Sequence, residues 1–255
     1  MVVDCARMTY DLKSVFPTLR RAPISEATID IQVTLLPDVN LEKLRAFHRG
    51  LEQRFPLVED RMRVAALLQM NKAAIPAITS QGPTPDGLLM RSESEALVVQ
   101  ARLDGFSLNK LAPYAKWDAL RAQAQELWQR YLDVAGPVAV KRLAVRYINR
   151  IELEPGVDFK ESILTVPEIA PGIPQGLPEY FMRLVIPHES GSTAIVTQAS
   201  LPPTFDMLFD IDVFRFTDIR ASDFEEIWPT LEELRAYKNV IFFNSITPKQ
   251  MEKYA

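Results

Sequence analysis

The stretch RLAVRYINRIEL, residues 142–153, alternates its side chains in the way typical of a β-strand. Every second side chain of a strand lies on the same face. Arg146 and Arg150 therefore share one face, and Tyr147 and Asn149 share the other. Each face carries polar groups among aliphatic neighbours, so this one strand bears both on the fold and on a candidate site.

The arginine face of this strand has two interpretations. Arg142 lies about 13 Å before Arg146, at roughly 3.3 Å per residue, and Arg150 continues the row. Guanidinium groups make paired hydrogen bonds to phosphates and carboxylates, so the row could bind an anionic ligand. Alternatively, the arginines pair with carboxylates across the sheet. The sequence leaves both interpretations open.

The stretch FDIDVFRF, residues 209–216, supplies such carboxylates. Asp210 and Asp212 share one strand face and lie roughly 7 Å apart. They could form ion pairs with Arg146 or Arg150. They could also hold a divalent cation if other oxygen ligands converged on them, although no third ligand is adjacent in the sequence.

Clear patterns precede the opening stretch. Alternation over residues 27–35 predicts a half-buried strand, and residues 40–55 predict a helix capped by Asn40. Residues 74–87, rich in proline and ending in Asp-Gly, predict a loop. A hairpin is expected near residues 92–95. The clearest helix covers residues 116–135, where apolar residues recur at helical spacing before Gly136 and Pro137.

Further strands and helices follow the opening stretch. Five prolines between residues 155 and 178 predict a long connection without a strand. Three strands are then expected at residues 180–188, 192–201 and 207–216. The capping box SDFE at residues 222–225 begins a helix that is kinked or restarted at Pro229, and Pro248 begins a short final helix.

This order of elements predicts an α+β fold. Tandem strand–helix–strand–strand units would surround an antiparallel sheet, with a helix at the C-terminal end. Residues 1–20 would form an N-terminal extension and residues 21–255 a single body. The order also suggests two similar halves within that body, residues 21–112 and 113–247.

Composition excludes several classes of protein. The chain has 29 basic and 33 acidic residues, a net charge of −4, which disfavours a nucleic-acid binder. A single cysteine, Cys5, excludes disulfides within the chain and indicates a reducing cytoplasm. No run of residues is apolar enough to predict a signal peptide or a membrane span. Translation could start at Met1 or at Met8.

Common catalytic motifs are missing from the sequence. Its two histidines, His48 and His188, have no metal-ligand spacing, and no glycine-rich phosphate loop occurs, so no cofactor is expected. Tyr114 and Trp117 stand at the start of the predicted helix over residues 116–135. They could form the rim of a pocket or fix how the chain enters the helix.

Several segments together resemble a sporadically distributed family of uncharacterised bacterial and archaeal proteins. In chain order they are RRAPISEATIDIQV, FSLNKLAPYAKWDALRAQAQELWQRY, RLAVRYINRIEL, LFDIDVF and NSITPK. The resemblance spans about residues 21 to 247, and the RYINRI strand motif is its most specific part. It carries no established activity. The family's patchy distribution implies an accessory role, in mobile or defence-associated loci.

The leading functional expectation is a cytoplasmic protein that binds without catalysing a reaction. Its ligand would be an unknown protein or a small anionic molecule, and its oligomeric state is left open. The candidate ligand-binding residues are Arg146, Asn149 and Arg150, with Tyr114 and Trp117 at a rim.

Two other functions remain open from the sequence. One is a metal-assisted phosphoester hydrolase, in which Asp210 and Asp212 hold the metal and Arg146 stabilises the phosphate charge. The other is a nucleic-acid binder that uses the local arginine row despite the acidic total.

Overall fold

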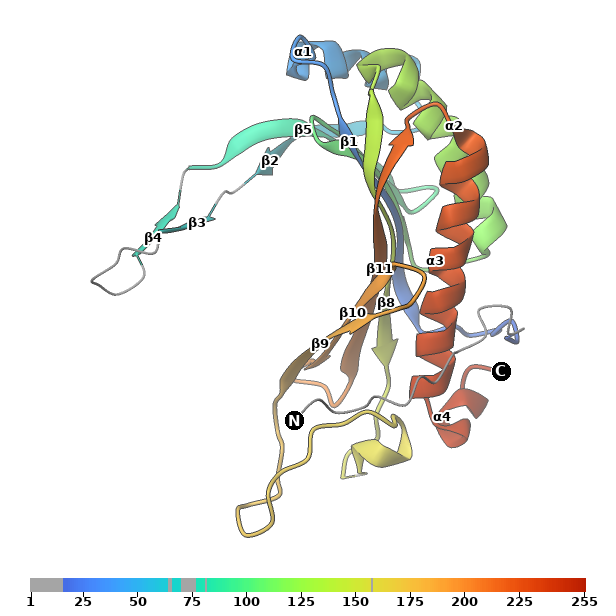
Figure 1. The fold of residues 1–255 in the computed structure, drawn as a ribbon. Coiled ribbons are helices and arrows are strands. Elements are labelled where there is room, and N and C mark those ends of the chain that lie inside the picture. Colours follow the sequence, from blue (N-terminus) through green and yellow to red (C-terminus); the bar gives the residue numbers. More distant parts are fainter. Residues whose placement is uncertain (1–15, 64–65, 70–76, 81, 157) are drawn as a thin grey trace. The chain divides into compact units, whose positions relative to one another are not determined.

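The computed structural model describes residues 16–63, 66–69, 77–80, 82–156 and 158–255 (Figure 1). Among these residues, nine strands form one antiparallel sheet in the order β2-β5-β6-β7-β1-β8-β11-β10-β9, and β3 pairs with β4 separately. This confirms the α+β class. The strands of the main sheet are β1 (Ile24–Thr34), β2 (Leu57–Arg63), β5 (Thr84–Ser92), β6 (Leu97–Arg102), β7 (Gly105–Leu111), β8 (Ala139–Ile151), β9 (Phe181–Pro187), β10 (Thr193–Ser200) and β11 (Met207–Arg220).

The chain divides into two compact units. Unit 1 contains the described residues up to Ala27 together with Ala144–Phe216 and Glu225–Ala255. Unit 2 contains Thr28–Leu143 and Thr217–Phe224. Strands β1, β8 and β11 contribute residues to both units. Each unit is thus assembled from segments that are not consecutive in the chain, and the two similar halves suggested by the order of elements stay a prediction.

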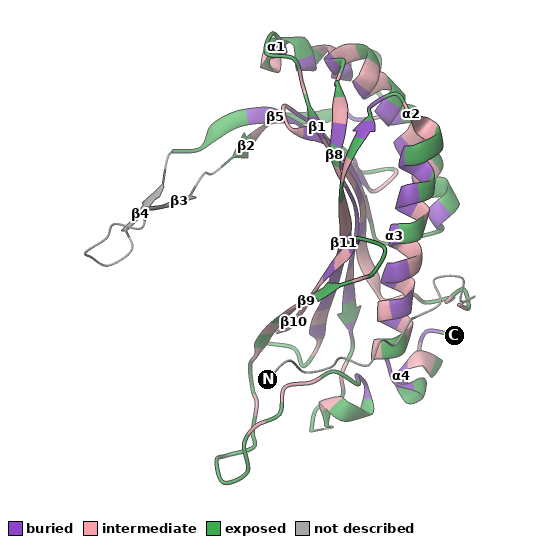
Figure 2. Cartoon of the chain, viewed as in Figure 1, coloured by how far each residue is buried: buried purple, intermediate pink, exposed green. Residues whose placement is uncertain are grey.

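Unit 2 is built on helix α2 (Trp117–Ala135), which packs on β7 through aromatic side chains. The ring centroid of Phe106 lies 6.0 Å from that of Trp128 and 6.1 Å from that of Tyr131. Buried and exposed residues alternate around the helix (Figure 2). Gly136 ends it with φ of 57°, and its N–H donates to the carbonyl of Leu132. The predicted helix is confirmed.

The helix predicted for residues 40–55 is mostly wrong. Only α1 (Leu41–Leu44) and a 3₁₀ turn, η1 (Arg45–His48), are helical, and Asn40 caps α1 as expected. The backbone leaves the helix at Arg49, and Gly50 follows with φ of 77°. Phe47 and Phe55 are nevertheless fully buried. Compact turns therefore bury the same apolar residues that suggested a longer helix.

The loop predicted for residues 74–87 is also wrong in its described part, which contains β4 (Ala77–Ser80) and the start of β5. β4 pairs with β3 (Ala66–Gln69). Gly87 lies inside β5, where an added Cβ would sit 2.5 Å from the carbonyl oxygen of Ala101. This glycine allows close approach of the neighbouring backbone, although its sequence context is typical of a turn.

Unit 1 places helix α3 (Phe224–Ser245) on one face of its strands. Phe242 of this helix lies 6.2 Å from Phe209 of β11, and the hydroxyl of Tyr237 donates to the carbonyl of Ile186 in β9. The helix contains Pro229 and continues through it, so the helix does not restart there.

Two further predictions, on the short final helix and on the proline-rich connection, are confirmed. Helix α4 (Pro248–Glu252) begins with Pro248 and is capped by the side chain of Thr247. Between Glu152 and Tyr180 the described residues contain no strand, and one short 3₁₀ turn, η2 (Phe159–Glu161), lies in this connection.

Candidate functional site

Strand β8 presents two different faces in unit 1. Val145, Tyr147 and Asn149 are buried, whereas Arg146 and Arg150 are exposed. The alternation predicted from the sequence therefore separates a core face from a solvent face. It also separates two of the candidate ligand-binding residues from the third, because Asn149 lies on the side opposite the arginines.

The exposed arginines of β8 form ion pairs with carboxylates of the neighbouring chain segment. Arg146 donates to both carboxylate oxygens of Asp210, at 2.9 and 2.7 Å. Arg150 donates from Nε to Asp206 at 2.6 Å. The hydrogen bonds that Arg146 donates to Asp210 raise the pKa of Arg146. Burial acts to lower this pKa, and the negative charge of Asp210 acts to raise it further. The charge of each arginine is thus balanced within the sheet.

Asn149 has a structural role in the core. Its side-chain amide donates to the carbonyl of Phe209 at 2.9 Å and to that of Tyr147 at 3.3 Å. These bonds satisfy a buried polar group on the face covered by α3. Asn149 does not reach solvent there, so it would need a structural change to contact a ligand.

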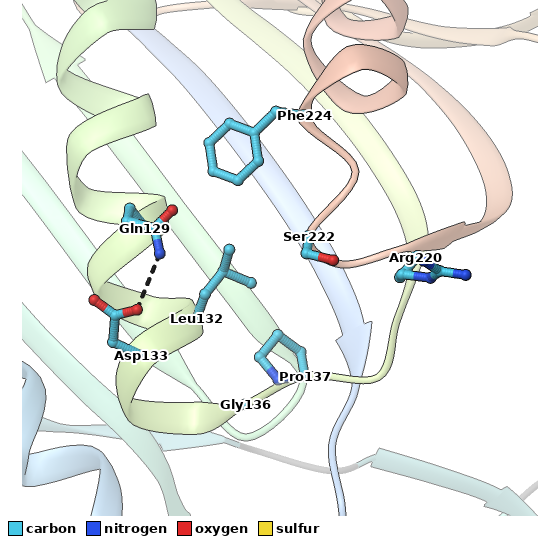
Figure 3. Close-up of a pocket in the computed structure, with 8 residues that line it drawn as sticks. All are labelled: Gln129, Leu132, Asp133, Gly136, Pro137, Arg220, Ser222 and Phe224. Atoms are coloured by element: carbon cyan, nitrogen blue, oxygen red, sulfur yellow. Dashed lines mark hydrogen bonds between the residues drawn. The ribbon is translucent and has the colours of Figure 1, made fainter.

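Tyr114 and Trp117 both belong to unit 2. Trp117 is buried at the start of α2, and Tyr114 is half-buried. A shallow open pocket of about 430 Å³ lies at the other end of the same helix, so neither residue lines it (Figure 3). The pocket is lined by Gln129, Leu132, Asp133, Gly136, Pro137, Arg220, Ser222 and Phe224.

The polar groups of this pocket do not converge on a common point. Gln129 donates to Asp133 at 2.9 Å, and the side chain of Arg220 points away from both (Figure 3). A binding pocket for a small ligand normally aims several polar groups at one place. This pocket therefore supports no specific chemistry.

The pair Asp210 and Asp212 does not extend to a metal site within the described residues. No group of three or more histidine, cysteine, aspartate or glutamate side chains there could hold a metal ion. Both carboxylate oxygens of Asp210 already accept hydrogen bonds from Arg146. A cation at Asp210 would have to displace that guanidinium.

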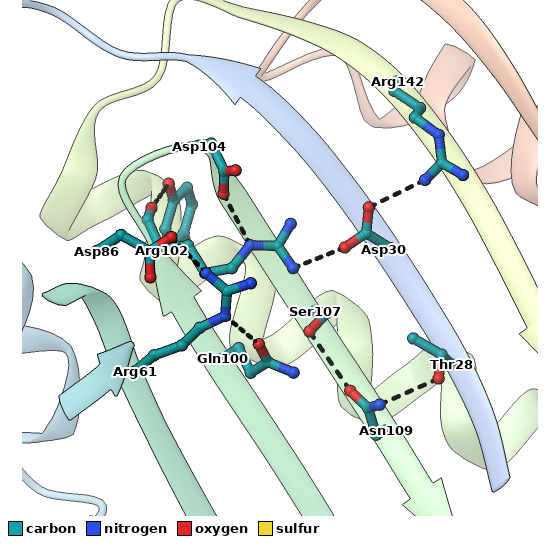
Figure 4. Close-up of polar contacts among 11 residues, drawn as sticks. Thr28, Asp30, Arg61, Asp86, Gln100, Arg102, Asp104, Ser107, Asn109 and Arg142 are labelled. Carbon is teal, nitrogen blue, oxygen red and sulfur yellow. Dashed lines mark hydrogen bonds and ion pairs between the residues drawn. The ribbon is translucent and has the colours of Figure 1, made fainter. Parts of the chain in front are cut away.

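Unit 2 contains a second network of paired charges, on one face of β1, β6 and β7 (Figure 4). The buried guanidinium of Arg102 contacts Asp30 at 2.8 Å and Asp104 at 2.9 Å, and Arg142 reaches Asp30 at 3.3 Å. Burial acts to lower the pKa of Arg102, but the two carboxylates outweigh it, so the pKa is raised.

Sequence reasoning missed a further part of this network. Arg61 of β2 contacts Asp86 of β5 at 2.5 Å and the side-chain oxygen of Gln100 at 2.7 Å (Figure 4). The other carboxylate oxygen of Asp86 is buried without a partner among the described residues. Polar residues at alternate strand positions, such as Gln100 and Arg102, were the available signal.

The exposed face of unit 1 also carries large apolar side chains. Phe181 and Val185 of β9 are 71% and 56% exposed, and Phe216 of β11 is 73% exposed. Phe214 packs edge-on against Phe216 with ring centroids 5.4 Å apart. Val185 of β9 is in register with Ile195 of β10, and Phe214 of β11 is in register with Thr193, two residues along β10 on the same face.

No protein-family model, curated protein or solved structure matches this chain. The family resemblance therefore stays a prediction, and the geometry of the described residues carries the functional argument. Among those residues, no helix is both long and apolar enough to cross a membrane.

Proposed function

We propose that this chain is a non-catalytic binding protein that docks a partner protein on the exposed face of β9, β10 and β11 in unit 1. The observation that carries the proposal is the exposure of Phe181, Val185 and Phe216 on these strands. The single cysteine, Cys5, supports placing this function in the cytoplasm.

The composition of this face is typical of a protein interface. Aromatic residues and arginine are enriched at interfaces, and exposed aromatic side chains supply most of the binding energy when a partner buries them. Here Phe181 lies on β9, and Phe214 and Phe216 lie on β11 together with Asp210, which pairs with Arg146. Scattered exposed apolar residues are ordinary, whereas several on one face of β9 and β11, the two strands that pair with β10, indicate a contact surface.

The ion pairs favour a protein partner over a small anion or a nucleic acid. An anion bound at Arg146 or Arg150 would have to displace Asp210 or Asp206. The loss of a bidentate, charge-assisted pair opposes that exchange. A protein surface can instead cover the pairs without breaking them.

Affinity purification from the native host tests the proposal. Tagged wild-type chain is compared with the double variant Phe181→Asp/Phe216→Asp. The control is Leu164→Asp, because Leu164 is 62% exposed and its backbone N–H bonds to the last residue of α3, Ser245, on the other side of the unit.

A partner protein should co-purify in stoichiometric amount with wild type and with the control Leu164→Asp. It should be lost with the double variant Phe181→Asp/Phe216→Asp. Equal recovery with all three chains, or no stoichiometric partner for wild type, would rule out this face as the docking surface. Circular dichroism of each purified chain shows whether the variants fold.

A further inference from the structure

Strand β9 lies at the end of the main sheet and pairs only with β10 among the described residues. In an antiparallel pair, residues alternate between bonding to the partner strand and pointing their N–H and C=O groups away from it. The N–H of His188 donates to Ser192, and the N–H of Ser200 donates to Tyr180. The even-numbered residues of β9 therefore bond to β10.

The odd-numbered residues of β9 consequently direct their backbone groups outward. The outward N–H groups belong to Phe181, Arg183 and Val185, and Pro187 has none. The side chains of these same residues are exposed on one face. The edge thus presents three backbone donors beside a row of exposed side chains.

The opposite end of the sheet shows how a protected edge is built. In β2, Glu59, Asp60 and Arg61 all form ion pairs, and a register shift between Arg61 and Met62 interrupts the strand. Charges and bulges of this kind prevent pairing with a foreign strand. β9 has no register shift in its pairing with β10, and its only charged residue is Arg183.

Arg183 differs from the other arginines on the strands of unit 1. Arg146, Arg150 and Arg215 each pair with a carboxylate of the chain. No carboxylate among the described residues pairs with Arg183, which is exposed between Phe181 and Val185. The free edge therefore carries one uncompensated positive charge flanked by two apolar side chains.

We infer that β9 receives an extended segment of the partner protein, which adds to the sheet as a further strand. An acidic residue of that segment would lie opposite Arg183. Apolar residues two positions to either side would contact Phe181 and Val185, because alternate residues of a strand share a face. Backbone bonds to a free edge supply affinity, and alternate side chains supply specificity. This inference rests on the proposed function and names the segment that the partner contributes.

A second copy of the chain fits this edge less well. A two-fold pairing centred on Arg183 places two like charges directly opposite each other, which destabilises the pair. A pairing centred on Leu184 places Phe181 opposite Pro187, which lacks the N–H needed to satisfy the carbonyl of Phe181. An acidic segment from another protein avoids both conflicts.

A displayed library of random short peptides tests the recognition pattern. Wild type should enrich peptides with aspartate or glutamate flanked two positions away by apolar residues. Arg183→Glu should enrich lysine or arginine at the central position instead. The peptide Thr-Val-Thr-Glu-Thr-Val-Thr should bind wild type about fivefold more tightly than its lysine-centred counterpart, since one cross-strand charge pair contributes up to about that factor. No enrichment with wild type, or the same enrichment with Arg183→Glu, would overturn the inference.

Val185→Pro tests the backbone bonds separately. Proline here removes an outward N–H and leaves the bonds to β10 intact, as is tolerated on edge strands. Binding of the glutamate peptide should fall more than about tenfold, since a donor is lost and the ring obstructs the edge. Val185→Ala, which keeps the N–H, should lose only a few fold. Equal losses for proline and alanine would overturn strand addition.

The same variant separates this inference from the proposed function. If Val185→Pro folds and still captures the native partner while Phe181→Asp/Phe216→Asp does not, the docking face stands and strand addition is wrong. Sedimentation of wild type and Val185→Pro provides a second check. A wild-type dimer that Val185→Pro abolishes, without peptide enrichment, would assign the edge to a second copy and overturn the inference.

Discussion

Lys238 of helix α3 is a buried charge whose removal should stabilise unit 1. Its side chain lies against Tyr147 of β8, with Nζ 3.9 Å from the centroid of the ring, and the residue is only 7% exposed. No carboxylate in the described part of the chain pairs with it. Burial, with a smaller contribution from the charge of Arg235, lowers the pKa of Lys238 from 10.5 to about 7.

The size of the effect follows from that change in pKa. One pKa unit corresponds to about 1.4 kcal/mol, so lowering the pKa of Lys238 from 10.5 to about 7 corresponds to a cost of about 5 kcal/mol when the lysine is charged. Lys238→Met keeps the volume and removes both the charge and its contact with the Tyr147 ring. It should therefore increase the free energy of unfolding by up to about 5 kcal/mol at pH 6.

The advantage of Lys238→Met should depend on pH. Below pH 7 the lysine is protonated in both the folded and the unfolded state, and the full cost is present. Between pH 7 and 10.5 the unfolded state binds more protons than the folded state, so wild type gains stability as pH rises. The difference between the two chains should narrow there by up to about 1.4 kcal/mol per pH unit.

Urea unfolding of both chains from pH 6 to 9.5, followed by circular dichroism, measures this difference. Lys160→Met is the matched control, because the side chain of Lys160 is exposed, and it should change stability by less than about 1 kcal/mol. A methionine variant that is less stable than wild type at pH 6, or a difference that does not change with pH, would refute the reasoning.

Three further experiments test the packing and the ion pairs. Asp210→Asn and Arg146→Met, made singly and together, should show a coupling free energy of about 1 kcal/mol in urea unfolding, since the side chain of Arg146 is 48% exposed. If the losses of stability in the two single variants simply add up in the double variant, the ion pair between Arg146 and Asp210 is contradicted. Arg102→Met should cost about 3 kcal/mol in the same assay because it leaves carboxylates uncompensated, and a loss near zero would argue against the network. Gly105→Ala should destabilise the fold by about 3 kcal/mol and lower the melting temperature in calorimetry, because φ at this residue is 152° and the added Cβ would lie 2.2 Å from the carbonyl oxygen of Ile31. An unchanged melting temperature would contradict this close approach.

The elements with strong periodicity were predictable from the sequence. Strand β8 and helix α2 have long, regular patterns, and both are present with nearly the expected bounds. The residues from 40 to 55 carry an equally apolar stripe, yet most of them form turns. Spacing alone cannot separate these outcomes, because turns and helices can bury the same side chains. The positive φ of Gly50 contributes to ending the helix early, and this φ depends on the surrounding structure.

The candidate site was predictable only in part. Alternation on two strands was enough to suggest the pair between Arg146 and Asp210, because both residues lie on defined faces. The network around Arg102 depends on the register of the neighbouring strands β6, β7, β1 and β8, which the pattern within each strand does not fix. The free edge at β9 depends on strand order, which local patterns do not encode. A site made by long-range strand pairing is therefore visible only in the structure.

Amide hydrogen exchange of β9, followed residue by residue by NMR, tests the central claim most directly. In the free chain, the amides of Phe181, Arg183 and Val185 should exchange rapidly, and those of Met182 and Leu184 should be protected by β10. Adding the captured partner, or a peptide selected on β9, should slow the three exposed amides selectively. Unchanged exchange at these amides in the bound state would contradict docking at this edge.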